Sequence, residues 1–153
     1  MNIPISQRII SILIYMLPWS EALPFGSHLF NEFDLFKLLI IPALPIIFIQ
    51  RLIPFGNIIL YIACFICVIR NPKVSYYIRF NMLQAILINI ILIIVSLIFQ
   101  ILSQSLSYPL LTNTFSSTVL LMALSIIIFS IIECFKGKEP DLPGISNSVR
   151  IQL

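Results

Sequence analysis

An uncharged apolar run at residues 80–102 restricts this chain to very few folds. As an α-helix at ~1.5 Å per residue, these residues would extend ~34 Å, which exceeds the ~30 Å hydrocarbon core of a bilayer. Helices suit this environment because their backbone polar groups are paired within the helix. The run therefore predicts a transmembrane helix.

The rest of the chain is also strongly apolar. Hydrophobic residues make up 59% of the 153 residues, charged residues make up 10%, and the mean hydropathy is +1.07. A soluble domain carries about 25% charged residues, and one this small cannot bury so much apolar surface in a single core. We therefore expect an all-α integral membrane protein without a second, soluble domain.

Four transmembrane spans are predicted along the chain. They lie at residues 9–24, 53–69, 80–102 and 118–135. Residues 35–49 are also apolar, but Pro42 and Pro45 interrupt the helical hydrogen-bond ladder there. We interpret that stretch as an interfacial or re-entrant amphipathic segment. Residues 1–135 would then form the membrane domain, and residues 136–153 a polar C-terminal tail outside the membrane.

The basic residues are distributed unevenly across these four spans. Of the nine Lys and Arg residues, only Lys37 and Arg51 fall on the side opposite the N-terminus, the 70–79 connection and the tail. Cytoplasmic loops carry the excess of positive charge, so both termini should face the cytoplasm or the stroma. A fifth span at residues 35–49 would move most basic residues to the far side, which favours four spans.

Side chains suited to catalysis or metal binding are scarce. His28 is the only histidine, and no cysteine or carboxylate cluster lies at ligand spacing around it. Cys64 and Cys67 form a CxxC pattern inside an apolar helix, where packing is the plainer interpretation. We expect no catalytic residue, no metal and no cofactor, and a protein that is not an enzyme. The net charge of +3 is too small and scattered for nucleic-acid binding.

Charged side chains are absent from the middle of the second, third and fourth predicted spans. Proton-coupled and ion-coupled transporters use such intramembrane charges, so this absence counts against a secondary transporter. The first span is the weakest of the four, because Pro18 and Glu21 interrupt it.

Polar side chains gather on one face of the third span and on one face of the fourth. On the third span they fall within an arc of about 100° on a helical projection. A buried amide in hydrocarbon needs a partner, so these faces should meet other helices or water. Either they bond neighbouring helices, or they line a polar path for a polypeptide or solute. The candidates for such a lining are Asn89, Ser96, Gln100, Thr118 and Ser125.

The connection before the third span carries a motif found in a known family. Arg70-Asn71 is followed by Arg79-Phe80-Asn81 and Gln84-Ala85, which open the long apolar helix. Residues 15–18, 23–26 and 137–146 agree as well, so that nearly the whole chain is covered in the same order. Together these stretches resemble the twenty-kilodalton subunit family of the translocon at the inner envelope of chloroplasts, including its cyanobacterial and plastid-encoded members.

The resemblance implies a four-helix membrane component of the protein import translocon, which takes part in the channel. Its partners would be other inner-envelope translocon subunits, precursor proteins in transit and membrane lipid. Four short helices are few to enclose a path, so we also expect homo-oligomers or larger partner subunits. At the stromal mouth of such a path the motif would place Arg70, Asn71, Arg79, Phe80, Asn81 and Gln84. For the basic residues, anchoring by lipid phosphates is the alternative interpretation.

Two further alternatives stay open at this stage. A non-transporting membrane scaffold that helps other complexes assemble is the alternative function. A small-solute channel is weaker, because no selectivity element or ring of charges is recognisable. The N-terminus shows no transit peptide, and the composition is rich in isoleucine. These features favour a plastid-encoded protein of the inner envelope, with a cyanobacterial plasma membrane as the alternative location.

Overall fold

A computed structural model describes residues 3–52, 54–105 and 109–153. These residues are mostly helical and contain no strand, which confirms the predicted all-α class. The elements in chain order are α1 (Ile5–Ile14), α2 (Met16–Ala22), η1 (Leu23–Gly26), α3 (Ser27–Glu32), η2 (Asp34–Ala43), α4 (Leu44–Leu52), α5 (Gly56–Cys64), η3 (Phe65–Ile69), α6 (Tyr76–Ser105), α7 (Pro109–Phe135) and α8 (Ile145–Gln152). Both η1 and η2 are 3-10 helices, and η3 is a π-helical continuation of α5.

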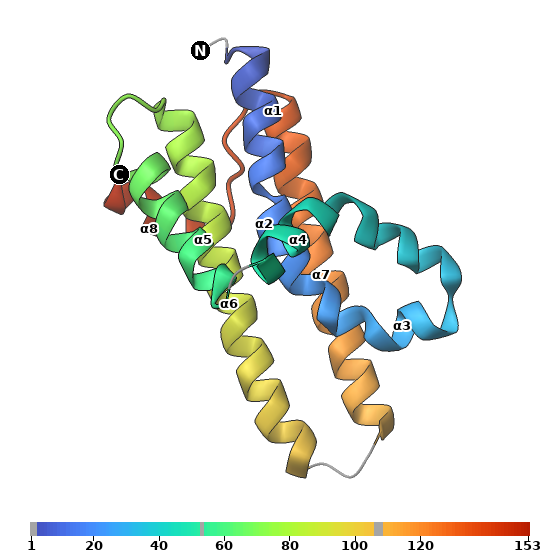
Figure 1. Ribbon diagram of the computed structural model, residues 1–153. Coiled ribbons are helices and arrows are strands. Elements are labelled where there is room, and N and C mark those ends of the chain that lie inside the picture. The colour runs from blue at the N-terminus through green and yellow to red at the C-terminus, as the bar shows by residue number, and fades with distance from the viewer. Residues whose placement is uncertain (1–2, 53, 106–108) are drawn as a thin grey trace.

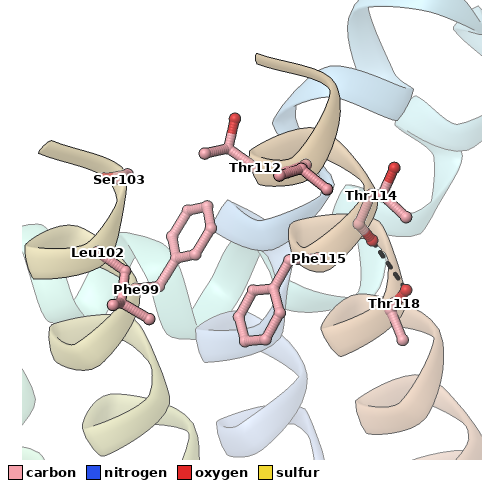
Figure 2. A pocket seen from close by; sticks show the side chains of 8 residues that line it. Phe99, Leu102, Ser103, Thr112, Thr114, Phe115 and Thr118 are labelled. Atoms are coloured by element: carbon pink, nitrogen blue, oxygen red, sulfur yellow. Dashed lines mark hydrogen bonds between the residues drawn. The ribbon is translucent and has the colours of Figure 1, made fainter. Parts of the chain in front are cut away.

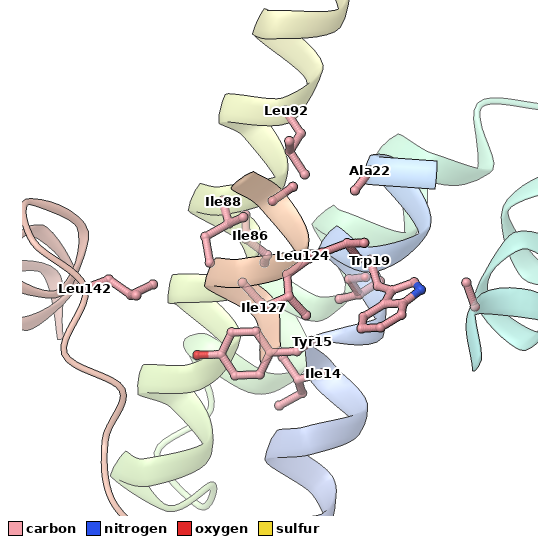
Figure 3. Packing of buried hydrophobic residues seen from close by; sticks show 14 of the residues in the cluster. Ile14, Tyr15, Trp19, Ala22, Ile86, Ile88, Leu92, Leu124, Ile127 and Leu142 are labelled. Atoms are coloured by element: carbon pink, nitrogen blue, oxygen red, sulfur yellow. The ribbon is translucent and has the colours of Figure 1, made fainter. Parts of the chain in front are cut away.

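The bundle is built around the two longest helices, α6 and α7. In Figure 1 these two helices run its full height, while α1 and α2 pack against them along one half of that height. Side chains from all four helices meet in the core, and Tyr15, Phe80, Ala85 and Ile127 are completely buried there. Figure 3 shows side chains of this cluster, among them Tyr15, Ile86 and Ile127, pointing toward one another from the neighbouring helices. The apolar runs of the sequence thus pack against each other as well as facing lipid.

Four helical segments are long and apolar enough to cross a membrane, as predicted. They are Ile5–Glu32, Asp34–Leu52, Tyr76–Ser103 and Pro109–Phe135. Three of them contain or largely overlap the predicted spans. The remaining one differs, because it coincides with the stretch interpreted as interfacial, whereas the predicted span at 53–69 corresponds to a shorter helix, Gly56–Ile69. Residue 53, where that span was predicted to begin, lies outside the described residues.

The direction of the chain still distinguishes these two segments. In Figure 1, α3, η2 and α4 leave the bundle sideways and run crosswise to α6 and α7, after which α5 returns along α6. Only 6% of the Asp34–Leu52 window is buried. The Trp19 indole fastens η2 to α2 by donating to the Leu39 carbonyl at 2.8 Å. A crosswise path is typical of an interfacial or re-entrant segment. Whether residues 35–49 form such a segment stays a prediction, because the length of the helix alone does not distinguish it from a transmembrane span.

The C-terminal segment is more closely packed than a polar tail would be. After α7 the chain folds back over α6, where Leu142, Ser146 and Val149 are buried. In Figure 1 the N-terminus, the C-terminal α8 and the connection before α6 all lie toward the same end of the bundle. This arrangement agrees with an even number of crossings.

We predict that both termini lie on the same side of the membrane. In sealed vesicles, a protease should digest tags at both ends together or leave both intact. As a control, Leu110→Cys, at the far end of α7 and 79% exposed, should react with an impermeant maleimide from the opposite side, in a protein whose native cysteines are replaced by alanine. Termini on opposite sides would show an odd number of crossings, so that Asp34–Leu52 and Gly56–Ile69 either both cross or both stay on one side.

Candidate functional site

A buried hydrogen-bond cluster around Asn81 joins α1, α6 and α7. Its side-chain oxygen accepts from the Tyr15 hydroxyl at 3.1 Å and from the Cys134 thiol at 3.1 Å. Its amide nitrogen donates to the Tyr77 carbonyl at 2.8 Å. Asn81 is completely buried, so each of these bonds replaces one that water would otherwise make. The cluster therefore acts as a polar joint inside an apolar bundle.

Gln84 lies one turn further along α6 and holds the C-terminal segment. Its amide nitrogen donates to the Pro140 carbonyl at 3.2 Å and to the Ser146 hydroxyl at 3.4 Å. The Ser146 oxygen also accepts from the Leu142 backbone at 2.7 Å. The motif residue Gln84 thus fixes the turn that returns the chain onto α6.

The remaining motif residues also make contacts within the chain. Arg79 donates to the Ile69 carbonyl at 2.8 Å and so satisfies one of the last carbonyls of η3. The Asn71 side chain accepts from the Lys73 backbone at 3.0 Å and shapes the turn before α6. The Phe80 ring is buried under the Arg150 guanidinium, 5.7 Å from the ring centre. Only Arg70 is exposed without such a contact, so a role of this motif at a stromal mouth stays a prediction.

The five residues predicted to line a path are not brought together in one chain. Asn89 is completely buried, whereas Ser96 is half-buried and bonded to exposed Gln100 at 3.4 Å. Thr118 and Ser125 are exposed on α7, and each donates to a carbonyl of its own helix. A shared lining would therefore need another subunit or a second copy.

Thr118 faces a cleft between the far ends of α6 and α7. The cleft has a volume of about 400 Å³, and apolar side chains make up most of its wall. Figure 2 shows Phe99 and Phe115 facing each other across it, with their rings stacked at 5.4 Å, and the hydrogen bond from Thr118 to Thr114 along its edge. Because its polar groups already make hydrogen bonds within their own helices, this cleft is suited only to packing against apolar groups.

A more polar cleft lies on the side of the bundle where α2, α4 and α5 meet. It consists of two adjoining hollows of about 540 and 460 Å³, which share Glu21, Gln50 and Asn57 in their walls. Arg51 lines the larger hollow and Tyr61 the smaller one. We call this feature the Glu21 cleft.

The polar groups of the Glu21 cleft are only loosely bonded to one another. The Tyr61 hydroxyl donates to Glu21 at 3.5 Å, and the Gln50 amide donates to Ser20 at 3.5 Å. Both distances are long for a hydrogen bond. Asn89 lies beside Tyr61 on α6, and its buried amide interacts with the Tyr61 hydroxyl but makes no hydrogen bond of good geometry to any described residue. Unlike the Asn81 cluster, this group retains unused bonding capacity.

A tight turn between α4 and α5 places two of these side chains. Phe55 adopts a left-handed conformation with φ of 60°, and Gly56 then approaches the end of α4 closely. A Cβ at Gly56 would lie 2.3 Å from the Gln50 carbonyl oxygen, so only glycine fits there. The turn thereby brings Gln50 and Asn57 into the wall that also contains Glu21.

Sequence reasoning identified Asn89, which lies beside Tyr61, but none of the polar residues that line the cleft. Glu21 was noted only as an interruption of the first span, although a carboxyl group within an apolar helix is itself a signal of function. Gln50, Asn57 and Tyr61 gave no signal, since only the crosswise path of α4 brings them to Glu21. In the described part of the chain, no three His, Cys, Asp or Glu side chains gather as metal ligands would.

Comparison with known proteins gives matches along almost the entire chain. A model of the family described as chloroplast import apparatus, Tic20-like, matches residues 6–149. A Tic20 family protein of Synechocystis sp. is 33% identical over 148 residues, covering 96% of this chain and 92% of the relative. Protein TIC 20-v, chloroplastic, of Arabidopsis thaliana is 29% identical over 99% of this chain and 73% of the relative. The Tic20 family protein Ycf60 of Gracilaria tenuistipitata var. liui is 32% identical over 99% and 78%.

We predict that Asn81→Leu lowers the free energy of unfolding in detergent by about 1–3 kcal/mol, because it leaves the buried Tyr15 hydroxyl and Cys134 thiol without their acceptor. Thermal or denaturant unfolding measures the change. Ser125→Ala, which removes only a bond to a carbonyl of its own helix, is the control and should alter stability far less. Equal stability of the two variants would mean that the cluster contributes nothing to the bundle.

Proposed function

Because the chain belongs to the Tic20-like family of the chloroplast import apparatus, we propose that it is a membrane subunit of the protein import translocon in the plastid inner envelope. The membership confirms the resemblance found in the motif from Arg70 to Gln84. Its role is not enzymatic: it provides part of the surroundings through which precursor proteins pass.

The filled core of the bundle indicates where such a passage would lie. Tyr15, Ala85 and Ile127 are completely buried where α1, α2, α6 and α7 meet, so side chains fill the space between these helices. An extended precursor also needs polar surroundings for its unpaired backbone groups. We therefore infer that one copy of this chain borders the passage, and that other copies or partner subunits complete it.

The same family supports a location in a plastid membrane. Two relatives from Arabidopsis thaliana carry chloroplastic in their names, and both match at least 98% of this chain. The relative from Synechocystis sp. keeps a cyanobacterial plasma membrane as the alternative location. We favour the plastid inner envelope, with precursor proteins, other translocon subunits and lipid as its partners.

A scaffold without a transport role is the competing function, and one observation favours it. Arg79, Phe80, Asn81 and Gln84 of the motif before and at the start of α6 all make contacts inside the chain. A motif used to stabilise the fold is what a scaffold requires. The loosely bonded Glu21 cleft favours transport instead, because a scaffold has no need for unused polar groups in the membrane.

We predict that a precursor arrested during import co-purifies with the tagged protein from mildly solubilised plastids. Together with other membrane subunits, it should be recovered well above the level of a precursor whose targeting segment is deleted. Immunoblotting of the eluate measures the ratio. Recovery of the intact membrane complex without the arrested precursor would favour the scaffold.

A further inference from the structure

Glu21 places a carboxyl group inside the long apolar segment Ile5–Glu32. A carboxyl group in a membrane segment is costly unless it faces a partner or a cavity, and this one faces both. Its one hydrogen bond to another described residue is the 3.5 Å contact from Tyr61, which is far longer than the ~2.7–2.8 Å usual between oxygens. The carboxyl oxygens therefore accept little hydrogen bonding from the protein and can accept further hydrogen bonds from a ligand.

The other side chains of the cleft provide free donors as well as acceptors. Arg51 and Asn57 have no hydrogen bond or ion pair to any other described side chain, although both line the larger hollow with Glu21. The carboxyl and guanidinium groups thus share one cleft without pairing. Gln50 adds an amide whose contact to Ser20 is long, at 3.5 Å. Acceptors and donors are mixed along a single wall.

A mixed wall of this kind fits the backbone of an extended polypeptide. Such a backbone presents N–H and C=O groups at each step of ~3.3 Å, and leaving them unpaired in an apolar environment is costly. A ligand of one charge sign would not use both Glu21 and Arg51. We propose that the Glu21 cleft binds an extended segment of a precursor protein, whose backbone N–H groups bond to Glu21 and whose carbonyls bond to Arg51 and Asn57. This inference rests on the proposed import function.

Asn89 completes this arrangement from inside the bundle. Its amide is completely buried beside the Tyr61 hydroxyl, with which it interacts without a hydrogen bond of good geometry, while that hydroxyl is bonded to Glu21. When a passing N–H group takes the Glu21 oxygen, the Tyr61 hydroxyl can turn fully to the Asn89 amide. Binding would then give one atom of this costly buried amide a better partner.

Photocrosslinking from the wall of the cleft tests the proposal directly. A photoreactive residue replaces Asn57, which lines both hollows, and in a second protein it replaces Ile128, which is 45% exposed on α7 outside the cleft. With a precursor arrested in plastids, Asn57 should give adducts at least about fivefold more abundant than Ile128. Equal yields, or adducts to lipid alone from Asn57, would overturn the proposal. Co-purification of the precursor in the same sample would show that the import function itself still holds.

A variant series measures the contribution of the carboxyl group. Glu21→Leu should slow import about tenfold, while Glu21→Gln, which keeps an acceptor, should slow it less. Glu133→Leu is the matched control, because that carboxyl group sits at the end of α7 and is paired with Lys136 at 2.7 Å. The complex size on a native gel shows whether each variant assembles. Import by an assembled Glu21→Leu protein at the rate of Glu133→Leu would contradict the proposal, and should Glu21→Leu fail to assemble, the Asn57 crosslink decides.

Discussion

The pairing of polar groups inside an apolar bundle is the constraint from which this structure follows. Lipid supplies no hydrogen bonds, so every amide or hydroxyl that enters the membrane must find its partner within the protein. Asn81 meets this requirement through Tyr15, Tyr77 and Cys134, and in doing so it fixes α1 and α7 against α6. Gln84 extends the same principle to the C-terminal segment.

The polar residues accordingly fall into two groups, and the difference separates structure from function. Around Asn81 the bonds are short, internal and nearly complete, as expected of groups that stabilise the fold. Around Glu21 they are long, and Asn89 makes none of good geometry to the described residues. Residues of the second group cost stability in the isolated chain, so their presence is better explained by something that binds to them. The family of the chain indicates that a polypeptide in transit is a suitable occupant.

Sequence reasoning predicted those parts of the structure that depend on local pattern. The uncharged run at 80–102 and the apolar run at 118–135 became the cores of α6 and α7, because length and hydropathy alone require a helix in lipid. Sequence reasoning also placed Asn89 on a polar face of the third span that should meet other helices or water, and Asn89 is buried within the bundle. It failed where the structure depends on contacts between segments far apart in the sequence. Val149 is buried on α6 because the C-terminal segment folds back over that helix. Gln50 approaches Glu21 because α4 runs crosswise to the bundle. Neither path is indicated by the periodicity of the sequence.

The short helix Gly56–Ile69 has a consequence for the lipid around it. At ~1.5 Å per residue it covers ~21 Å, well below the ~30 Å of an ordinary hydrocarbon core. A bilayer meets such a hydrophobic mismatch by thinning locally or by drawing in another helix. The Glu21 cleft begins at the end of this helix, where Asn57 and Tyr61 stand. Where the bilayer responds by thinning, a hydrophilic segment entering beside the Glu21 cleft would have less hydrocarbon to cross.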